Sequence, residues 1–398
     1  MKNKALRAAG GAVLALAMLT AAGCAGAGGG NSTGGGDATL IPLGASMEMT
    51  GAAASTGVPW SRGVELAVEQ ANGKDGFEVD GKKYKWDLKL NDNQSLPDKT
   101  ISDYRGFVGS GVKFIAGPAL SSSFVPAFNA LGNAPALVLT PSSIAKTVKP
   151  KADQSVFITL SNGEASFNQS YAQAVLDATG AKTVAIALPQ DAVSDTFTKL
   201  FTDFFTSKGV KIVDTKRFPP DTTNFAPYIN SLQAANPELV LTGYLDKWAA
   251  TLMQQSSDAG FTSANWMMTV GSTQDGLAKA QGDIKKVFFP IPVKSVVNED
   301  DAMLDTFRTL WTEKYGSAPV FNDFNALAYY DPILMLTQAM KDAKSVTDVK
   351  AISDALVKVT TWDGAASEGG FDPEVHVRTY PVNYGVLEDG KATYFQVK

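Results

Sequence analysis

Short apolar runs alternate with helical patterns along most of the chain, and this alternation limits the possible folds more than any other feature. Residues 112–116 (VKFIA) and 136–139 (ALVL) have the length and the Gly, Pro and Ser flanks of buried strands. Residues 63–70 carry apolar side chains at helical spacing. The alternation is typical of α/β proteins with a mostly parallel sheet. Because 398 residues exceed one ordinary core, we expect two α/β lobes.

The pattern changes near the Pro-flanked residues 290–292, which we interpret as a candidate crossing between the lobes. Beyond them, residues 301–315 and 322–342 have the periodicity of long helices. Two strand candidates, 382–387 and 393–397, close the chain.

The N-terminal residues 1–23 have the composition of a secretory signal peptide. A short positive region precedes an apolar run at residues 12–19, and small residues follow at 21–23. The apolar run is too short to span a bilayer. We therefore expect these 23 residues to direct the chain out of the cytoplasm.

Cys24 is the only cysteine, so neither an intrachain disulfide nor a cysteine-based metal cage can form. Its position directly after small residues resembles the lipobox of bacterial lipoproteins, although Ala21 stands where that pattern prefers leucine. The alternative is an incidental cysteine that packs as a small apolar residue. Residues 24–37 continue as a Gly-rich stretch without large apolar side chains, which indicates a flexible tether. We expect a protein anchored outside the membrane through a lipid on Cys24.

Several function classes lack the residues that they need. The net charge of −5, without dense Lys/Arg patches, argues against nucleic-acid binding. His376 is the sole histidine, which excludes an H-E-x-x-H zinc site, and no G-x-S-x-G elbow or Walker loop occurs. We therefore predict neither an enzyme nor a bound metal or cofactor, and we expect His376 to have a packing or solvated role.

Two Ser-rich loops follow the runs at 112–116 and 136–139, and they are the candidate binding elements. Ligands of open α/β sheets bind beyond the carboxyl ends of the strands, where helix N-termini present unpaired N–H groups. Serine hydroxyls and free backbone N–H groups in both loops could hold a carboxylate or amide oxygen. The alternative is that these serines are ordinary helix N-caps. The serines concerned are Ser121, Ser122, Ser142 and Ser143.

The chain resembles the type I periplasmic binding proteins of the leucine-binding, amide and aromatic-acid receptor group, which serve ABC transporters. The resemblance covers nearly the full length and rests on short motifs in a fixed order. These are Met49-Thr50-Gly51 with Gly57, residues 62–68 (RGVELAV), Asn91-Asp92-Asn93, residues 111–117 (GVKFIAG), Ser121-Ser122-Ser123, Thr140-Pro141-Ser142, residues 218–225 (FPPDTTNF), Gly243-Tyr244 and Phe371-Asp372.

The resemblance implies two Rossmann-like lobes with parallel sheets, joined by a hinge of three crossings. Lobe 1 would comprise residues 38–158 plus 292–365, and lobe 2 residues 159–291 plus 366–398. A small solute would be trapped by lobe closure and delivered to an ABC permease and ATPase complex, with the binding protein acting as a monomer. A ligand-sensing receptor module and a secreted two-lobe enzyme are the alternatives.

The resemblance also implies roles for particular residues. Ser121 and the Ser142-Ser143 loop match positions that hold a ligand carboxylate and, through a backbone carbonyl, an ammonium. Tyr244 matches a contact from the second lobe. Thr56 stands where relatives place an aromatic lid, and Trp60 could either replace that lid or belong to the core.

Two departures from the family pattern concern the ligand. Val193 stands where amino-acid-binding relatives carry a tyrosine, and Val270 where they carry the acid that pairs the ammonium. Asp191, Asp195 or Asp275 could stand in for that acid. Without a counter-charge, a buried ammonium would cost at least several kcal/mol. The departures therefore favour an aromatic or aliphatic acid, or an amide, as the ligand.

Overall fold

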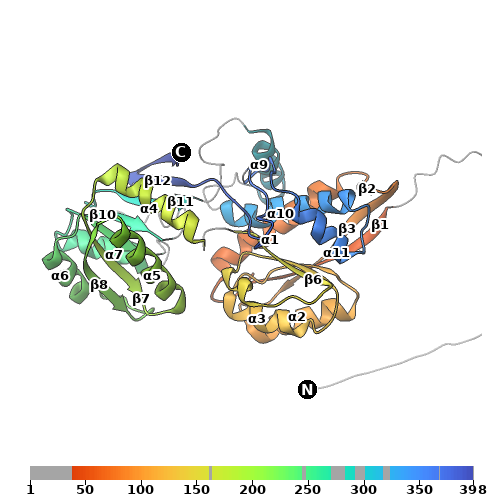
Figure 1. Cartoon of the computed structure of the whole chain (residues 1–398), viewed down its shortest axis with the longest axis horizontal. Coiled ribbons are helices and arrows are strands. Elements are labelled where there is room, and N and C mark those ends of the chain that lie inside the picture. The colour runs from red at the N-terminus through yellow and green to blue at the C-terminus, as the bar shows by residue number, and fades with distance from the viewer. Residues whose placement is uncertain are drawn as a thin grey trace, which may run out of the picture. The chain divides into compact units, whose positions relative to one another are not determined.

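The computed structural model describes residues 38–160, 164–243, 248–269, 283–291, 301–316, 323–366 and 368–397 (Figure 1). The predicted signal peptide, Cys24 and the tether lie outside these residues. Within them, the chain forms a six-stranded and a seven-stranded sheet, each packed against helices. None of the described helices combines the length and the apolar run needed to cross a membrane.

The first sheet has the strand order β2-β3-β1-β4-β5-β6. Its strands are β1 (Thr39–Met47), β2 (Phe77–Val79), β3 (Lys82–Asp92), β4 (Phe114–Ala116), β5 (Ala136–Thr140) and β6 (Gln154–Ile158). All neighbours are parallel except β2, which is antiparallel to β3 at the edge. The carboxyl ends of β1, β4 and β5 therefore meet at one edge of the sheet.

Helices cover both faces of this sheet. They are α1 (Ala54–Asn72), α2 (Pro97–Gly109), α3 (Ser121–Ala130), α10 (Asp323–Asp342) and α11 (Val349–Val357), with a 3-10 turn η1 (Ser143–Thr147). Helix α9 (Ala302–Tyr315) packs on α1. In β4, Phe114 packs into the cluster of α1 and α10, whereas the next residue, Ile115, packs into the cluster of α2 and α3. This alternation with period two is what a strand buried on both faces requires. At Gly63 of α1, a β-carbon would lie 1.9 Å from the carbonyl oxygen of Ala326, so glycine permits the close approach of α10.

The second sheet has the order β13-β12-β11-β10-β9-β7-β8. Its strands are β7 (Thr183–Pro189), β8 (Lys211–Phe218), β9 (Leu239–Thr242), β10 (Asn265–Met268), β11 (Val287–Ile291), β12 (Asn383–Glu388) and β13 (Lys391–Gln396). Strands β7 to β11 are parallel, and β12 and β13 add an antiparallel hairpin. Helices α4 (Ala165–Thr179), α5 (Ala192–Ser207), α6 (Ala226–Ala235) and α7 (Ala250–Asp258) belong to this lobe.

The predicted fold class, two α/β lobes with largely parallel sheets, is confirmed, and the differences lie in single strands. Pro290 and Ile291, the first two residues of the predicted crossing 290–292, lie inside β11, with Pro290 opposite Tyr384 of β12, and Pro292 lies outside the described residues. Strand β6 has no counterpart among the predicted strands because its first residues, Gln154 and Ser155, are polar.

Residues 376–380, which precede β12 of the second sheet, lie beside the end of β6. The Ile158 N–H donates to the His376 carbonyl at 2.8 Å, the Arg378 N–H donates to the Ile158 carbonyl at 2.7 Å, and the Tyr380 hydroxyl donates to the Thr159 carbonyl at 2.6 Å. The His376 ring stacks on Phe157 with 4.6 Å between centroids. The sole histidine therefore packs against a core residue, and the lobe boundaries at 158/159, 291/292 and 365/366 stay a prediction.

A buried ion pair fixes this segment to α10. Arg378 Nη2 lies 3.3 Å from Asp331 Oδ2, and both side chains are fully buried. Asp331 also accepts hydrogen bonds from the N–H groups of Ala365 and Ala366 at 2.9 and 2.8 Å. One carboxylate thus joins α10 to two separate stretches of the C-terminal region.

Replacing Asp331 with Ala should lower the free energy of unfolding by about 3–5 kcal/mol, because the Arg378 charge would stay buried without this partner. Denaturant unfolding followed by circular dichroism measures the change. Asp354→Ala, which removes an exposed ion pair with Lys350, is the control and should leave the midpoint unchanged. Equal effects of the two substitutions would contradict the importance of the buried pair.

Candidate ligand-binding site

Two serines from separate loops meet at the carboxyl edge of the first sheet. Ser121 begins α3 after β4, and Ser142 precedes η1 after β5. Their Oγ atoms lie 2.9 Å apart, within hydrogen-bonding distance. Ser142 is buried, Ser121 is half-buried, and the adjacent Ser122 and Ser143 are exposed.

The helix-cap alternative for these serines does not fit the geometry. The residue that caps α3 is Leu120, and Ser121 lies one position further along the helix. Ser142 is in the capping position of η1, but its hydroxyl makes no capping hydrogen bond. The two hydroxyls face each other, and only one can use its proton in that contact, so the other proton remains available for a further acceptor.

A buried carboxylate fastens the loop in front of Ser121. Glu48, at the end of β1, accepts hydrogen bonds on Oε1 from the N–H groups of Ala119 and Leu120 at 3.2 and 3.1 Å. Burial raises the pKa of Glu48 above its ordinary value, while these backbone bonds and the side chain of Asn93 lower it in part. Glu48 is not among the site residues predicted from the sequence. The one feature of the sequence that points to it is its position directly after an apolar strand.

Two other elements, α2 and β5, hold the same loop. Tyr104 of α2 donates to the Gly117 carbonyl, and Thr140 of β5 donates to the Pro118 carbonyl at 2.6 Å. Gly117 has φ +84°, and a β-carbon there would lie 2.2 Å from the Ser46 carbonyl oxygen. Only glycine fits this position without strain.

Some of the backbone N–H groups in these two loops are already used by the protein. The N–H groups of Ala119 and Leu120 are bonded to Glu48, and that of Ser142 lies 3.2 Å from Thr140 Oγ1.

The predicted lid residues lie at the start of α1. The Thr56 hydroxyl donates to the Ala53 carbonyl at 3.0 Å, so it is used within its own helix. Trp60 is partly buried and packs against the core of the first lobe, as the second of its two predicted roles requires. A lid role for either residue stays a prediction.

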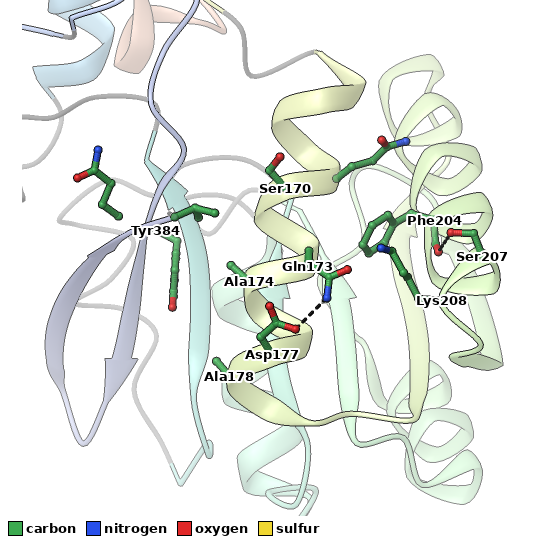
Figure 2. Close-up of a pocket in the computed structure, with 12 residues that line it drawn as sticks. Ser170, Gln173, Ala174, Asp177, Ala178, Phe204, Ser207, Lys208 and Tyr384 are labelled. Atoms are coloured by element: carbon green, nitrogen blue, oxygen red, sulfur yellow. Dashed lines mark hydrogen bonds between the residues drawn. The ribbon is translucent and has the colours of Figure 1, made fainter.

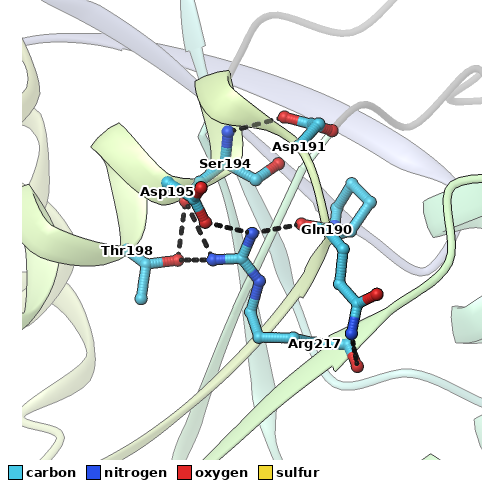
Figure 3. A network of polar contacts seen from close by, with 7 residues as sticks. Gln190, Asp191, Ser194, Asp195, Thr198 and Arg217 are labelled. Carbon is cyan, nitrogen blue, oxygen red and sulfur yellow. Dashed lines mark hydrogen bonds and ion pairs between the residues drawn. The ribbon is translucent and has the colours of Figure 1, made fainter.

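A polar network occupies the corresponding edge of the second sheet (Figure 3). Asp191 caps α5 by accepting from the Ser194 N–H at 2.7 Å. Asp195 pairs with Arg217 of β8 at 2.7 Å, and the same guanidinium donates to Thr198 Oγ1 at 2.8 Å. Of the three candidate stand-in acids, the two in the described residues are thus already bound to protein donors.

Val193 lies between these two acids and is 49% exposed, the only predicted second-lobe contact whose surroundings the structure describes. Tyr244, Val270 and Asp275 lie outside the described residues. Their contact with a ligand stays a prediction.

A hollow of about 820 Å³ in the second lobe is a poor candidate for the site (Figure 2). Its lining includes Phe204, Ser207 and Lys208, at the end of α5 remote from Val193. On α4, which lines one wall, Gln173 donates to Asp177 at 2.8 Å, one helical turn further on. The hollow therefore lies away from the carboxyl edge of the sheet, where ligands of α/β proteins bind.

Comparison with known proteins places this arrangement in a family. A family model described as periplasmic binding protein matches residues 40–391. The chain belongs to the periplasmic binding protein family. The leucine-, isoleucine-, valine-, threonine- and alanine-binding protein of Pseudomonas aeruginosa is 21% identical over 91% of the chain and 93% of that protein. The Leu/Ile/Val-binding protein homolog 3 of Brucella melitensis is 26% identical over 55% of the chain and 58% of that protein.

Solved structures establish the fold as type I. The substrate-binding protein of a branched-chain amino acid transporter from Streptococcus pneumoniae, in complex with isoleucine, aligns with a TM-score of 0.72, 20% identity, and 90% and 100% coverage of the two chains. A solute-binding protein of an ABC transporter from Rhodopseudomonas palustris, in complex with 3,4-dihydroxy benzoic acid, aligns with a TM-score of 0.69, 20% identity, and 90% and 98% coverage. At these identities the structures show a shared fold.

The raised pKa of Glu48 predicts a pH dependence of stability. Because the native state holds this proton more tightly than the unfolded state, unfolding releases it at pH values between the ordinary and the raised pKa. The free energy of unfolding of the wild type should therefore fall, relative to Glu48→Gln, as pH rises from about 4. Urea unfolding of both proteins between pH 4 and 8 measures the difference, and parallel curves would contradict it.

Proposed function

We propose that the chain is the extracellular solute-binding lipoprotein of an ABC importer, anchored at Cys24. It would capture a small organic solute between its lobes and deliver it to a permease and ATPase complex. The observation that carries the proposal is the Ser121–Ser142 pair at the carboxyl edge of the first sheet. Family membership supports it, because the relatives named above are solute-binding proteins.

The chemistry at this edge suits an oxygen-rich ligand group. The hydroxyl proton that the serine pair does not use can be donated to a carboxylate or an amide oxygen of the ligand, and the bond to a charged acceptor is the stronger one. The first turn of α3 adds the positive end of a helix dipole. Contacts from the second lobe would then favour the closed form, so that binding shifts the population of conformations and no covalent bond changes.

The charges at the second sheet favour a ligand without an ammonium group. Asp191 is engaged in a helix cap, and Asp195 is compensated by Arg217. Neither is poised to neutralise a buried ammonium, whereas the exposed Val193 offers an apolar contact. With Val270 at the family's acid position, we propose an aromatic or aliphatic acid, or an amide, as the ligand.

A thermal-shift screen of the purified protein over amino acids, amides and aromatic acids tests both the solute-binding function and the proposed class of ligand. A solute of the proposed class should raise the melting temperature, because a ligand that binds only the native state stabilises it. Tight binding of leucine or valine by calorimetry would overturn the ligand class, and conversion of a solute to product would favour an enzyme.

Ser142→Ala should weaken binding of the solute found in that screen about 10- to 100-fold, the cost of a hydrogen bond to a charged group. The matched control is Ser155→Ala, since Ser155 also forms a hydroxyl pair, with Ser353 at 2.7 Å in the same lobe. Calorimetry of the three proteins measures the change. Equal affinity of Ser142→Ala and the wild type would refute the site.

A further inference from the structure

We propose that Glu48 is a positioning residue for ligand binding, whose buried carboxylate holds the loop 117–120 so that Ser121 meets Ser142. The inference rests on the proposed function, because it assigns a role to Glu48 at that same site. Glu48 does not reach the ligand itself, since its side chain is fully buried.

The connection from Glu48 to the serine pair is short. Oε1 accepts from two successive N–H groups, those of Ala119 and Leu120, and Ser121 is the next residue. Leu120 is also the residue from which α3 starts, with its carbonyl accepting from Ser123 and Phe124 at 3.0 and 3.1 Å. A displacement of this carboxylate therefore moves the first turn of α3.

The surroundings of Glu48 also fix its carboxylate in place. Asn93 bonds to Glu48, and its amide lies 3.4 Å from Ser46 Oγ. Ser46 in turn donates to Asp103 at 2.7 Å. Tyr104 from α2 and Tyr329 from α10 are buried near the same charge. The carboxylate is thus bonded by Asn93, directly after β3, and is enclosed near tyrosines of α2 and α10 while it holds the loop.

Burial of the Glu48 carboxylate lowers the stability of the native state relative to an apolar side chain of similar size, because removing a charged or polar group from water costs free energy. What the carboxylate adds is one oxygen atom that accepts two adjacent N–H groups. The 2.9 Å contact between the serines depends on the position of that oxygen, since a shift of about 1 Å exceeds the range of a hydrogen bond.

Two conservative variants of Glu48 show whether its oxygen positions the loop 117–120 or whether the side chain only fills the space beneath it. Glu48→Gln keeps an oxygen near Oε1, whereas Glu48→Asp keeps the charge but withdraws the oxygen by one methylene group. Hydrogen–deuterium exchange of the ligand-free protein should be at least tenfold faster at Ala119 and Leu120 in Glu48→Asp and close to the wild type in Glu48→Gln.

The matched control is Asp331→Asn, which alters another fully buried carboxylate of the same lobe that accepts two successive N–H groups. Its faster exchange should be confined to the stretches that Asp331 holds, Ala365, Ala366 and the segment around Arg378, and should not reach the loop 117–120. The proposal fails if Glu48→Asp leaves the loop protected, or if Asp331→Asn exposes the loop equally.

Calorimetry with 3,4-dihydroxybenzoate provides the binding readout. We expect at least tenfold weaker affinity for Glu48→Asp and a change within about threefold for Glu48→Gln. Equal losses in both variants, or no loss in either, would overturn the positioning role. If the wild type does not bind this probe, the proposed ligand class is weakened, while the exchange experiment still decides the role of Glu48.

Discussion

The parallel register of β1, β4 and β5 is the constraint on which the candidate site depends. Ala116 of β4 pairs with Ala45 of β1 on one side and with Leu139 of β5 on the other. The three strands therefore end at nearly the same level, although up to about 90 residues separate them along the chain. Polar groups that follow each strand are brought together by the sheet itself.

The sequence contains enough local information to predict much of this arrangement. Apolar runs with Gly, Pro and Ser flanks identify β4 and β5, and the rule for carboxyl edges then brings Ser121 and Ser142 together. Strand β11 is harder to predict because it contains Pro290, and proline is unusual inside a sheet. Local composition also does not predict β6, because this strand begins with the polar residues Gln154 and Ser155.

Contacts between distant residues account for what the sequence could not predict. Glu48 acquires its role from N–H groups more than 70 residues away, and no spacing rule connects them. Arg217 likewise reaches Asp195 from a neighbouring strand, which removes an acid that seemed available for a ligand. Sequence patterns thus predicted two loops that lie together at the sheet edge, whereas the partner of each charged side chain required the three-dimensional structure.

The hydrogen bonds around β6 also bear on lobe closure. If the lobes close as proposed, the crossing segments must bend where they are least restrained. The ladder between Ile158 and Val377, together with the Asp331–Arg378 pair, fixes the start of two crossings to the first lobe. The Tyr380 hydroxyl extends this attachment as far as Thr159. If the lobes close as proposed, bending beyond Thr159 and Tyr380 would keep these bonds and the Ser121–Ser142 pair intact, whereas the predicted boundary at 365/366 would divide a segment that is bonded to the first lobe as far as Tyr380.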